Sequence, residues 1–155
     1  MNVALELNGR SVGLECEPDE MLLAVLRREG LRSVRATCGI GVCGACTVLV
    51  DGEPVSGCLM LAALSAGRRV TTVEGLSSAD PVPRAFVEAH AYQCGWCTPG
   101  FILTAKALLA YNPDPSEAEI GEALGGNLCR CGSYVEIVAA IRRAAAELAG
   151  GALRQ

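Results

Sequence analysis

The sequence has 155 residues, enough for one domain of ordinary size or for two small ones. Hydrophobic residues make up 51% and charged residues 19%, a composition that excludes an intrinsically disordered chain. The formal net charge of −4 gives no support for nucleic acid or an anionic membrane surface as a partner. Because residues 1–10 carry no export signal and no apolar run could span a bilayer, we expect a cytoplasmic protein without membrane insertion.

Residues 1–78 predict a small mixed sheet that covers one helix. Segments of alternating apolar and polar residues are joined at Asn8-Gly9 and at Asp51-Gly52, two dipeptides that are typical of tight hairpin turns. The expected elements are strands at 3–7, 11–16, 47–50, 53–58 and 70–73, a helix from about 18 to 30, and a helical turn at 59–66.

A loop with three cysteines and three glycines lies between that helix and the third strand. Cys38, Cys43 and Cys46 have the C-x4-C-x2-C spacing of a plant-type [2Fe–2S] site, and glycines let the backbone curl around such a cluster. In the expected hairpin, position 46 pairs with Gly57, so Cys58 returns as a fourth ligand. The stretch also matches G-x-G-x-x-G, but a strand rather than a helix follows it, which excludes a dinucleotide site.

A proline-rich segment at 80–83 ends the sheet pattern, and beyond it the apolar period changes from 2 to 3.6. We therefore divide the chain into residues 1–78 and a helical domain of residues 79–155. Ser116 and Ser133 each precede a glutamate by three residues, the signature of a capping box at a helix start. The expected helices lie at about 82–92, 99–111, 116–124 and 133–149.

The helical domain holds four more cysteines in two pairs. One pair, Cys94 and Cys97, precedes the helix expected at 99–111, and Thr98 is expected to cap that helix. The other pair, Cys129 and Cys131, precedes the helix expected at 133–149. The positive ends of both helix dipoles would stabilise an anionic cluster there. Two cysteine pairs can also hold zinc, which stays an alternative, whereas a thioredoxin-type dithiol is disfavoured because no strand precedes the C-x-x-C pair.

Three remaining residues are given structural roles. Cys16 lies in a strand pattern and is expected as a buried thiol. His90, the single histidine, is expected within a helix as a surface or packing residue. Trp96 is expected to pack, or to shield the second cluster from water.

Together these motifs resemble the small [2Fe–2S] subunit of the molybdenum hydroxylases, the family of xanthine oxidase, aldehyde oxidoreductase and carbon monoxide dehydrogenase. The likeness covers residues 3–148, and three stretches carry it: Cys38–Val48, Gln93–Gly100 and Gly126–Cys131. The resemblance implies an α+β protein, with an N-terminal β-grasp domain like plant-type ferredoxins and then an all-α four-helix bundle. Each domain would hold one [2Fe–2S] cluster.

The resemblance also implies partners. A large subunit would hold a molybdopterin cofactor, often the cytosine dinucleotide form, and a medium subunit would hold FAD, in a heterotrimer that can dimerise. This chain would be the electron-transfer subunit of that oxidoreductase, without a catalytic site of its own. It would relay electrons through the cluster of the helical domain, then through the ferredoxin-like cluster, to FAD or another acceptor.

The family motifs also assign individual roles. Gln93 would hydrogen-bond the pterin cofactor, and Cys131 would turn its sulfur toward it. The expected metal ligands are Cys38, Cys43, Cys46, Cys58, Cys94, Cys97, Cys129 and Cys131. The sequence departs from the family at Thr37, where a glycine is usual, and at Gly132-Ser133, where many relatives have Thr-Gly. Neither departure removes a ligand.

Two other functions stay open at this point. One is a free-standing two-cluster ferredoxin that carries electrons between unrelated enzymes. The other is a mixed protein with one iron–sulfur cluster and a structural zinc in the helical half. High apolar content and low charge favour buried interfaces, and therefore a role within a complex over that of a free carrier.

Overall fold

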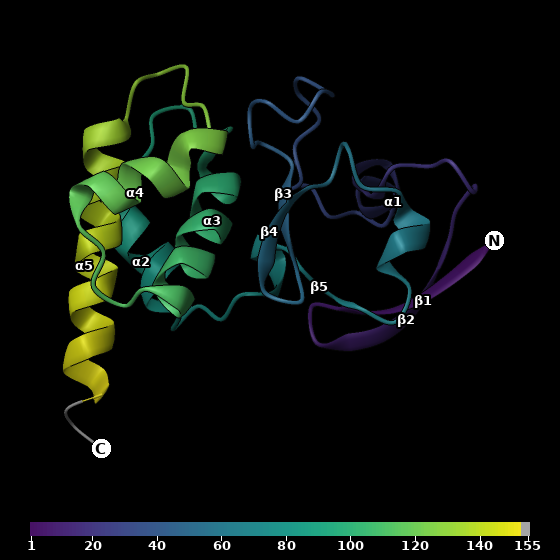
Figure 1. Ribbon diagram of the computed structural model, residues 1–155, viewed down its shortest axis with the longest axis horizontal. Coiled ribbons are helices and arrows are strands. Elements are labelled where there is room, and N and C mark those ends of the chain that lie inside the picture. The colour runs from purple at the N-terminus through teal and green to yellow at the C-terminus, as the bar shows by residue number, and fades with distance from the viewer. Residues whose placement is uncertain (153–155) are drawn as a thin grey trace.

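The computed structural model describes residues 1–152. A five-stranded sheet with one helix forms the N-terminal half, and four helices form the other half beside it (Figure 1). The strands are β1 (Asn2–Leu7), β2 (Arg10–Glu15), β3 (Thr47–Val50), β4 (Glu53–Ser56) and β5 (Arg69–Thr71). The α-helices are α1 (Leu22–Arg28), α2 (Pro81–Glu88), α3 (Thr98–Tyr111), α4 (Glu117–Ala123) and α5 (Tyr134–Ala152). Short 3-10 turns are η1 (Ala62–Ser65), η2 (Val73–Gly75) and η3 (Leu124–Gly126).

The sheet has the order β2-β1-β5-β3-β4, in which β1 and β5 run parallel and the other neighbours run antiparallel. Both predicted hairpins form. Asn8 and Gly9 have φ of 51° and 78°, and Asp51 and Gly52 have φ of 53° and 94°. Two consecutive positive φ values define the type I′ turn, whose twist matches that of the flanking strands, and this explains the Asn-Gly and Asp-Gly pairs.

The core of the sheet domain lies between α1 and one face of the sheet. Leu22, Val25 and Leu26 are fully buried there, and Cys16 joins them as the buried thiol that its position predicted. The helix begins at Leu22 rather than near residue 18, because the residues before it form a turn.

Strand β3 is buried on both faces, unlike its neighbour β4. Val48 and Val50 point into the core beneath α1. Because side chains alternate along a strand, Thr47 and Leu49 point to the opposite face, which α3 covers. Helix α3 is accordingly apolar almost all round, as a helix buried on two sides must be.

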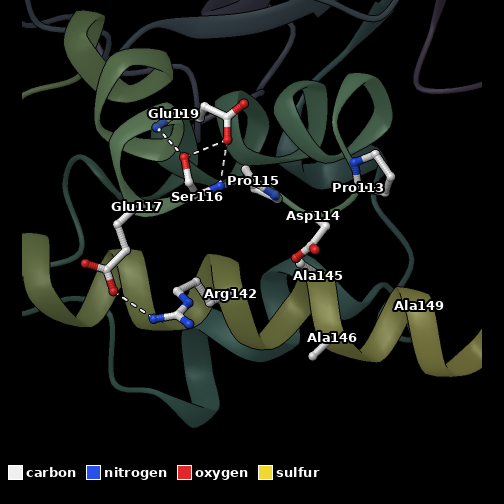
Figure 2. A pocket seen from close by; sticks show the side chains of 10 residues that line it. All are labelled: Pro113, Asp114, Pro115, Ser116, Glu117, Glu119, Arg142, Ala145, Ala146 and Ala149. Carbon is white, nitrogen blue, oxygen red and sulfur yellow. Dashed lines mark hydrogen bonds and ion pairs between the residues drawn. The ribbon is translucent and has the colours of Figure 1, made fainter.

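The helical domain packs α2, α3, α4 and α5 around a second core. Its largest fully buried side chains are Phe86, Phe101, Ile120, Ile137 and Ile141. The predicted capping box forms at the start of α4, where Ser116 and Glu119 each accept a hydrogen bond from the other's backbone N–H (Figure 2). At the start of α5, by contrast, the Ser133 carbonyl accepts the backbone N–H of Ile137 at 3.0 Å, and within residues 1–152 no hydrogen bond joins the Ser133 side chain to Glu136.

Helix α2 is shorter than predicted, because it ends at Glu88. His90 follows with φ of 50°, and the Ala91 N–H donates to the Phe86 carbonyl at 2.9 Å. This is a Schellman end with histidine in the position that glycine usually takes. The expectation that His90 lies in a helix was therefore wrong: it is a residue of the turn that follows α2.

No helix within residues 1–152 is both long enough and apolar enough to cross a bilayer.

Candidate metal centres

The first cysteine loop directs backbone N–H groups at a thiol. Gly39, Gly41 and Gly44 all have positive φ, between 65° and 74°, which curls residues 38–46 tightly. The N–H groups of Ile40, Cys43 and Val42, together with the Cys43 thiol, lower the pKa of Cys38 to about 6. Donors that favour a thiolate here also suit an anionic cluster held by thiolates.

The β3–β4 hairpin brings the fourth cysteine to this loop. Thr47 pairs with Ser56, and the Gly57 N–H donates to the Cys46 carbonyl at 3.2 Å, which is the register that the sequence predicted. The Cys46 thiol contacts the Cys58 thiol, and burial raises the pKa of Cys46 to about 11. This inner pair is buried, whereas the outer pair, Cys38 and Cys43, is half-buried.

The second set repeats this division into an outer and an inner pair. Cys94 contacts Cys131, and both are exposed. Cys97 contacts Cys129, and this inner pair lies deeper, so that burial raises the pKa of Cys97 to about 12. The backbone N–H of Trp96 and the Cys131 thiol lower the pKa of Cys94.

The arrangement of the thiols in pairs indicates which metal group they can bind. A zinc site of this type needs four ligands around one point. A [2Fe–2S] cluster needs two thiolates at each of two irons, and each set offers two adjacent pairs. The donors of each set therefore fit a two-iron cluster.

Thr98 does not cap α3 as predicted. The N-cap residue is Cys97, and the buried Thr98 hydroxyl has no hydrogen-bond partner among residues 1–152. A buried hydroxyl without a partner is unfavourable, and a cluster sulfur beside Cys97 would supply an acceptor. The Tyr134 hydroxyl, which accepts the Cys129 N–H at 2.9 Å, is a further contact that the sequence did not reveal.

The two cysteine sets lie next to each other. The Leu128 N–H donates to the Cys43 carbonyl at 2.9 Å, which joins the first loop to the residue before Cys129. A cavity of about 410 Å³ lies between the sets, and Cys43, Cys97 and Cys129 all line it.

Trp96 closes one side of this cavity and links the two domains. Its indole N–H donates to the Thr37 hydroxyl at 2.9 Å, and the Arg35 guanidinium lies 4.7 Å from the ring centroid. Thr37, the residue that replaces the usual glycine, is thus the acceptor that holds Trp96 in place.

The residues expected to face a partner are on the surface. Gln93 is exposed and directly precedes the exposed Cys94, whose thiol contacts Cys131. Large apolar side chains are also exposed near each set: Ile40, Val42 and Leu59 near the first, and Leu128 and Val135 near the second.

A further cavity of about 760 Å³ lies between the α3–α4 loop and α5 (Figure 2). It is lined by Pro113, Asp114 and small residues of α5, and the ion pair of Glu117 with Arg142 spans it at 2.7 Å. No cysteine lines it, so it is separate from the candidate metal centres.

Comparisons with known families and proteins agree with this geometry. The family described as "2Fe-2S iron-sulfur cluster binding domain" matches residues 5–71, and the family "[2Fe-2S] binding domain" matches residues 72–142. One of the nicotinate dehydrogenase subunits of Pseudomonas putida is 47% identical over 147 residues, which cover 92% of this chain and 94% of that protein. The nicotinate dehydrogenase small FeS subunit of Eubacterium barkeri is 48% identical over 149 residues, covering 93% and 94%.

Solved structures show the same fold. A chain of quinoline 2-oxidoreductase from Pseudomonas putida 86 matches with a TM-score of 0.91 and 42% identity, covering 96% of this chain and 95% of that one. Aldehyde oxidoreductase from Desulfovibrio gigas matches with a TM-score of 0.92 and 36% identity, covering 97% of this chain but 17% of that longer chain.

Proposed function

Because this chain belongs to the small [2Fe–2S] subunits of the molybdenum hydroxylases, we propose that it relays electrons from a molybdopterin centre in a large subunit to FAD in a medium one. The chain binds [2Fe–2S] clusters and acts as the electron-transfer component of an oxidoreductase. The proposal includes the cysteine ligands of the clusters, the molybdopterin and FAD of the partner subunits, and assembly of the three subunits as a heterotrimer. A cytoplasmic location stays a prediction from the sequence.

The observation that carries the proposal is the grouping of eight thiols into two sets, each with an outer and an inner pair. We assign one cluster to each set, with one iron held by each pair. Held by these thiolates, a cluster would supply one-electron redox chemistry. The ligands of the first are Cys38, Cys43, Cys46 and Cys58, and those of the second are Cys94, Cys97, Cys129 and Cys131.

The surface supports a place between two partners. The outer pair of the second set is exposed beside Gln93, so a pterin could approach Gln93 and Cys131 from solvent. The outer pair of the first set is bordered by Ile40, which is 68% exposed, and by Leu59, which is 58% exposed. Apolar side chains that are exposed in the free chain are typical of surfaces covered in an assembly, and this favours a complex over a free ferredoxin.

The named relatives also favour one substrate class for the complex. Two are nicotinate dehydrogenase subunits, one is a nicotine 6-hydroxylase subunit, and one solved structure is a quinoline oxidoreductase. We therefore propose that the large partner oxidises an N-heteroaromatic compound. Adding nicotinate, quinoline or an aldehyde to the oxidised complex and recording which one bleaches the iron–sulfur absorbance tests this choice.

The relay itself is tested by the metals of the complex that copurifies with this chain from its native host. We expect about four irons per copy of the chain, no stoichiometric zinc, and molybdenum on a larger partner. Four irons without a partner would support the free carrier instead. About two irons and one zinc would show that the helical half is a structural module.

A further inference from the structure

Five residues connect the two cysteine sets. Binding of the clusters by the eight cysteines would not by itself require this contact. Cys43 and Gly44 come from the first loop, Thr104 comes from α3, and Asn127 and Leu128 follow η3. We call these five residues the bridge group.

Asn127 is the centre of the bridge group. The residue is 5% exposed, its Nδ2 donates to the Gly44 carbonyl at 3.2 Å, and its Oδ1 accepts the Thr104 hydroxyl at 2.9 Å. A carbonyl can only accept, so the amide nitrogen has to face Gly44 and the orientation of the side chain is fixed. A buried amide satisfied at both ends joins the first loop to α3 rigidly.

The residue after Asn127 completes the connection. The Leu128 N–H donates to the Cys43 carbonyl at 2.9 Å, and one peptide bond further along is Cys129. A path through covalent bonds and a single hydrogen bond therefore runs from the sulfur of Cys43 to the sulfur of Cys129. It joins the outer pair of the first set to the inner pair of the second.

The first loop packs tightly against Asn127 and against the first turn of α3, so the two segments cannot shift relative to each other. A Cβ atom on Gly44 would lie 2.4 Å from the Asn127 Nδ2 atom. A Cβ atom on Gly100, in the first turn of α3, would lie 2.1 Å from the Gly44 carbonyl oxygen. Both glycines are buried. The separation of the two sets is thus fixed by backbone-to-backbone contact and by the Asn127 amide.

We propose that Asn127 is a positioning residue that holds the Cys43–Leu128 hydrogen bond as the electron route between the two clusters. The inference rests on the proposed function, because it requires both clusters. In each transfer the cluster of the second set loses one electron and is oxidised, and the cluster of the first set gains it and is reduced. No covalent bond breaks and no proton moves.

The test uses Asn127→Leu in the complex purified from its host. Leucine has a similar volume but neither donates nor accepts, so both side-chain hydrogen bonds are lost. We expect both cluster signals in electron paramagnetic resonance (EPR) and both reduction potentials to persist. The magnetic splitting between the reduced clusters should be lost or reduced, and transfer between them after flash photoreduction should be slower.

Matched variants separate this role from general stability. Thr104→Val removes one of the two bonds and should give a smaller effect in the same direction, whereas Thr104→Ser keeps the hydroxyl and should behave as the unmodified chain. Asn112→Leu makes the same replacement after the other end of α3, where Asn112 bonds Glu119 at 3.1 Å, and should change neither splitting nor transfer.

The outcomes are distinguishable. Unchanged splitting and transfer in Asn127→Leu, with both clusters present, would overturn the inference and leave the proposed function standing. Loss of a cluster in both Asn127→Leu and Thr104→Val would also overturn it, because the residues would then serve cluster assembly. Fewer than two cluster signals in the unmodified complex would overturn the proposed function itself.

Discussion

The sheet domain and the helical domain each gather four cysteines, but by different means. In the first, three of the four thiols come from residues 38–46, and the backbone conformation of that loop places them. A tight hairpin adds Cys58. In the second, each half of the site is a short pair before a helix, and the pairs meet only because α3 and α5 pack in the same bundle.

The difference indicates which interactions each site depends on. A local site depends on turn geometry, so its ligands are in place when one hairpin and one loop have formed. The second site depends on contacts between residues far apart in sequence. It also packs against the first domain, because Asn127 and Gly100 both contact Gly44. The helical site should therefore respond more strongly to changes in packing.

Removal of one ligand from each set is the strongest test of this division. Cys43→Ser should abolish the ferredoxin-like cluster and keep the helical one, and Cys97→Ser should do the reverse, because in each variant one iron of the affected set would lose one of its two thiolates. EPR on the reduced protein should lose one signal in each variant. Loss of both signals from a folded protein in either variant would contradict the proposed ligand sets.

A single methyl group tests the dependence of the helical site on packing. Gly100→Ala puts a Cβ atom against the Gly44 carbonyl, so α3 has to shift, at a cost of about 1–3 kcal/mol. We expect a lower midpoint of thermal unfolding and a perturbed EPR signal from the second cluster. The first cluster, whose ligands are local, should change less.

Gly121→Ala is the matched control for that substitution. Gly121 lies in α4 with no atom near its added Cβ, and alanine there should raise stability by up to about 1 kcal/mol. Equal destabilisation by both substitutions would show that the close contact between Gly100 and Gly44 is not what makes Gly100→Ala destabilising.

The same division explains what could be predicted from the sequence. The hairpin at Asp51-Gly52 fixes the pairing of Cys46 with Gly57, because a type I′ turn sets the register of its strands. The helices of the second domain were predicted from apolar spacing. Their relative placement was not, so the hydrogen bonds from Trp96 to Thr37 and from Leu128 to Cys43 came only from the structure.

Two local features were also missed. His90 adopts a left-handed conformation that glycine or asparagine usually signals, so nothing in the sequence marked the early end of α2. Cys97 rather than Thr98 takes the cap position of α3, and it makes no side-chain cap hydrogen bond. The ligand sets and the division of the chain at residue 78 stay predictions.

The smallest expected effect concerns Glu74, which ties η2 to the sheet domain. Burial raises the pKa of Glu74, but hydrogen bonds from Ser33 and Thr72 outweigh it and hold the pKa below its usual 4.5. A carboxyl group with a lowered folded-state pKa stabilises the protein above pH 4.5, and this stabilisation is lost as the pH falls through the folded-state value.

Glu74→Gln should therefore lower the unfolding temperature slightly at neutral pH, and the difference should shrink as the pH falls below 4.5. Thermal unfolding of both proteins across this range measures it. Glu136→Gln, an exposed change on α5, serves as the control. A difference that is constant with pH would show that the Glu74 charge does not contribute.

Helix α3 covers the face of β3 that carries Leu49, although it belongs to the other half of the sequence. During synthesis the whole sheet leaves the ribosome before α3, the helix that shields this face, does so, and uncovered apolar faces favour aggregation of nascent chains. The adjacent strand β4 forms an open edge, but Pro54 has no N–H to offer a neighbouring chain. The proline thus limits self-association at the edge of the sheet that adjoins β3.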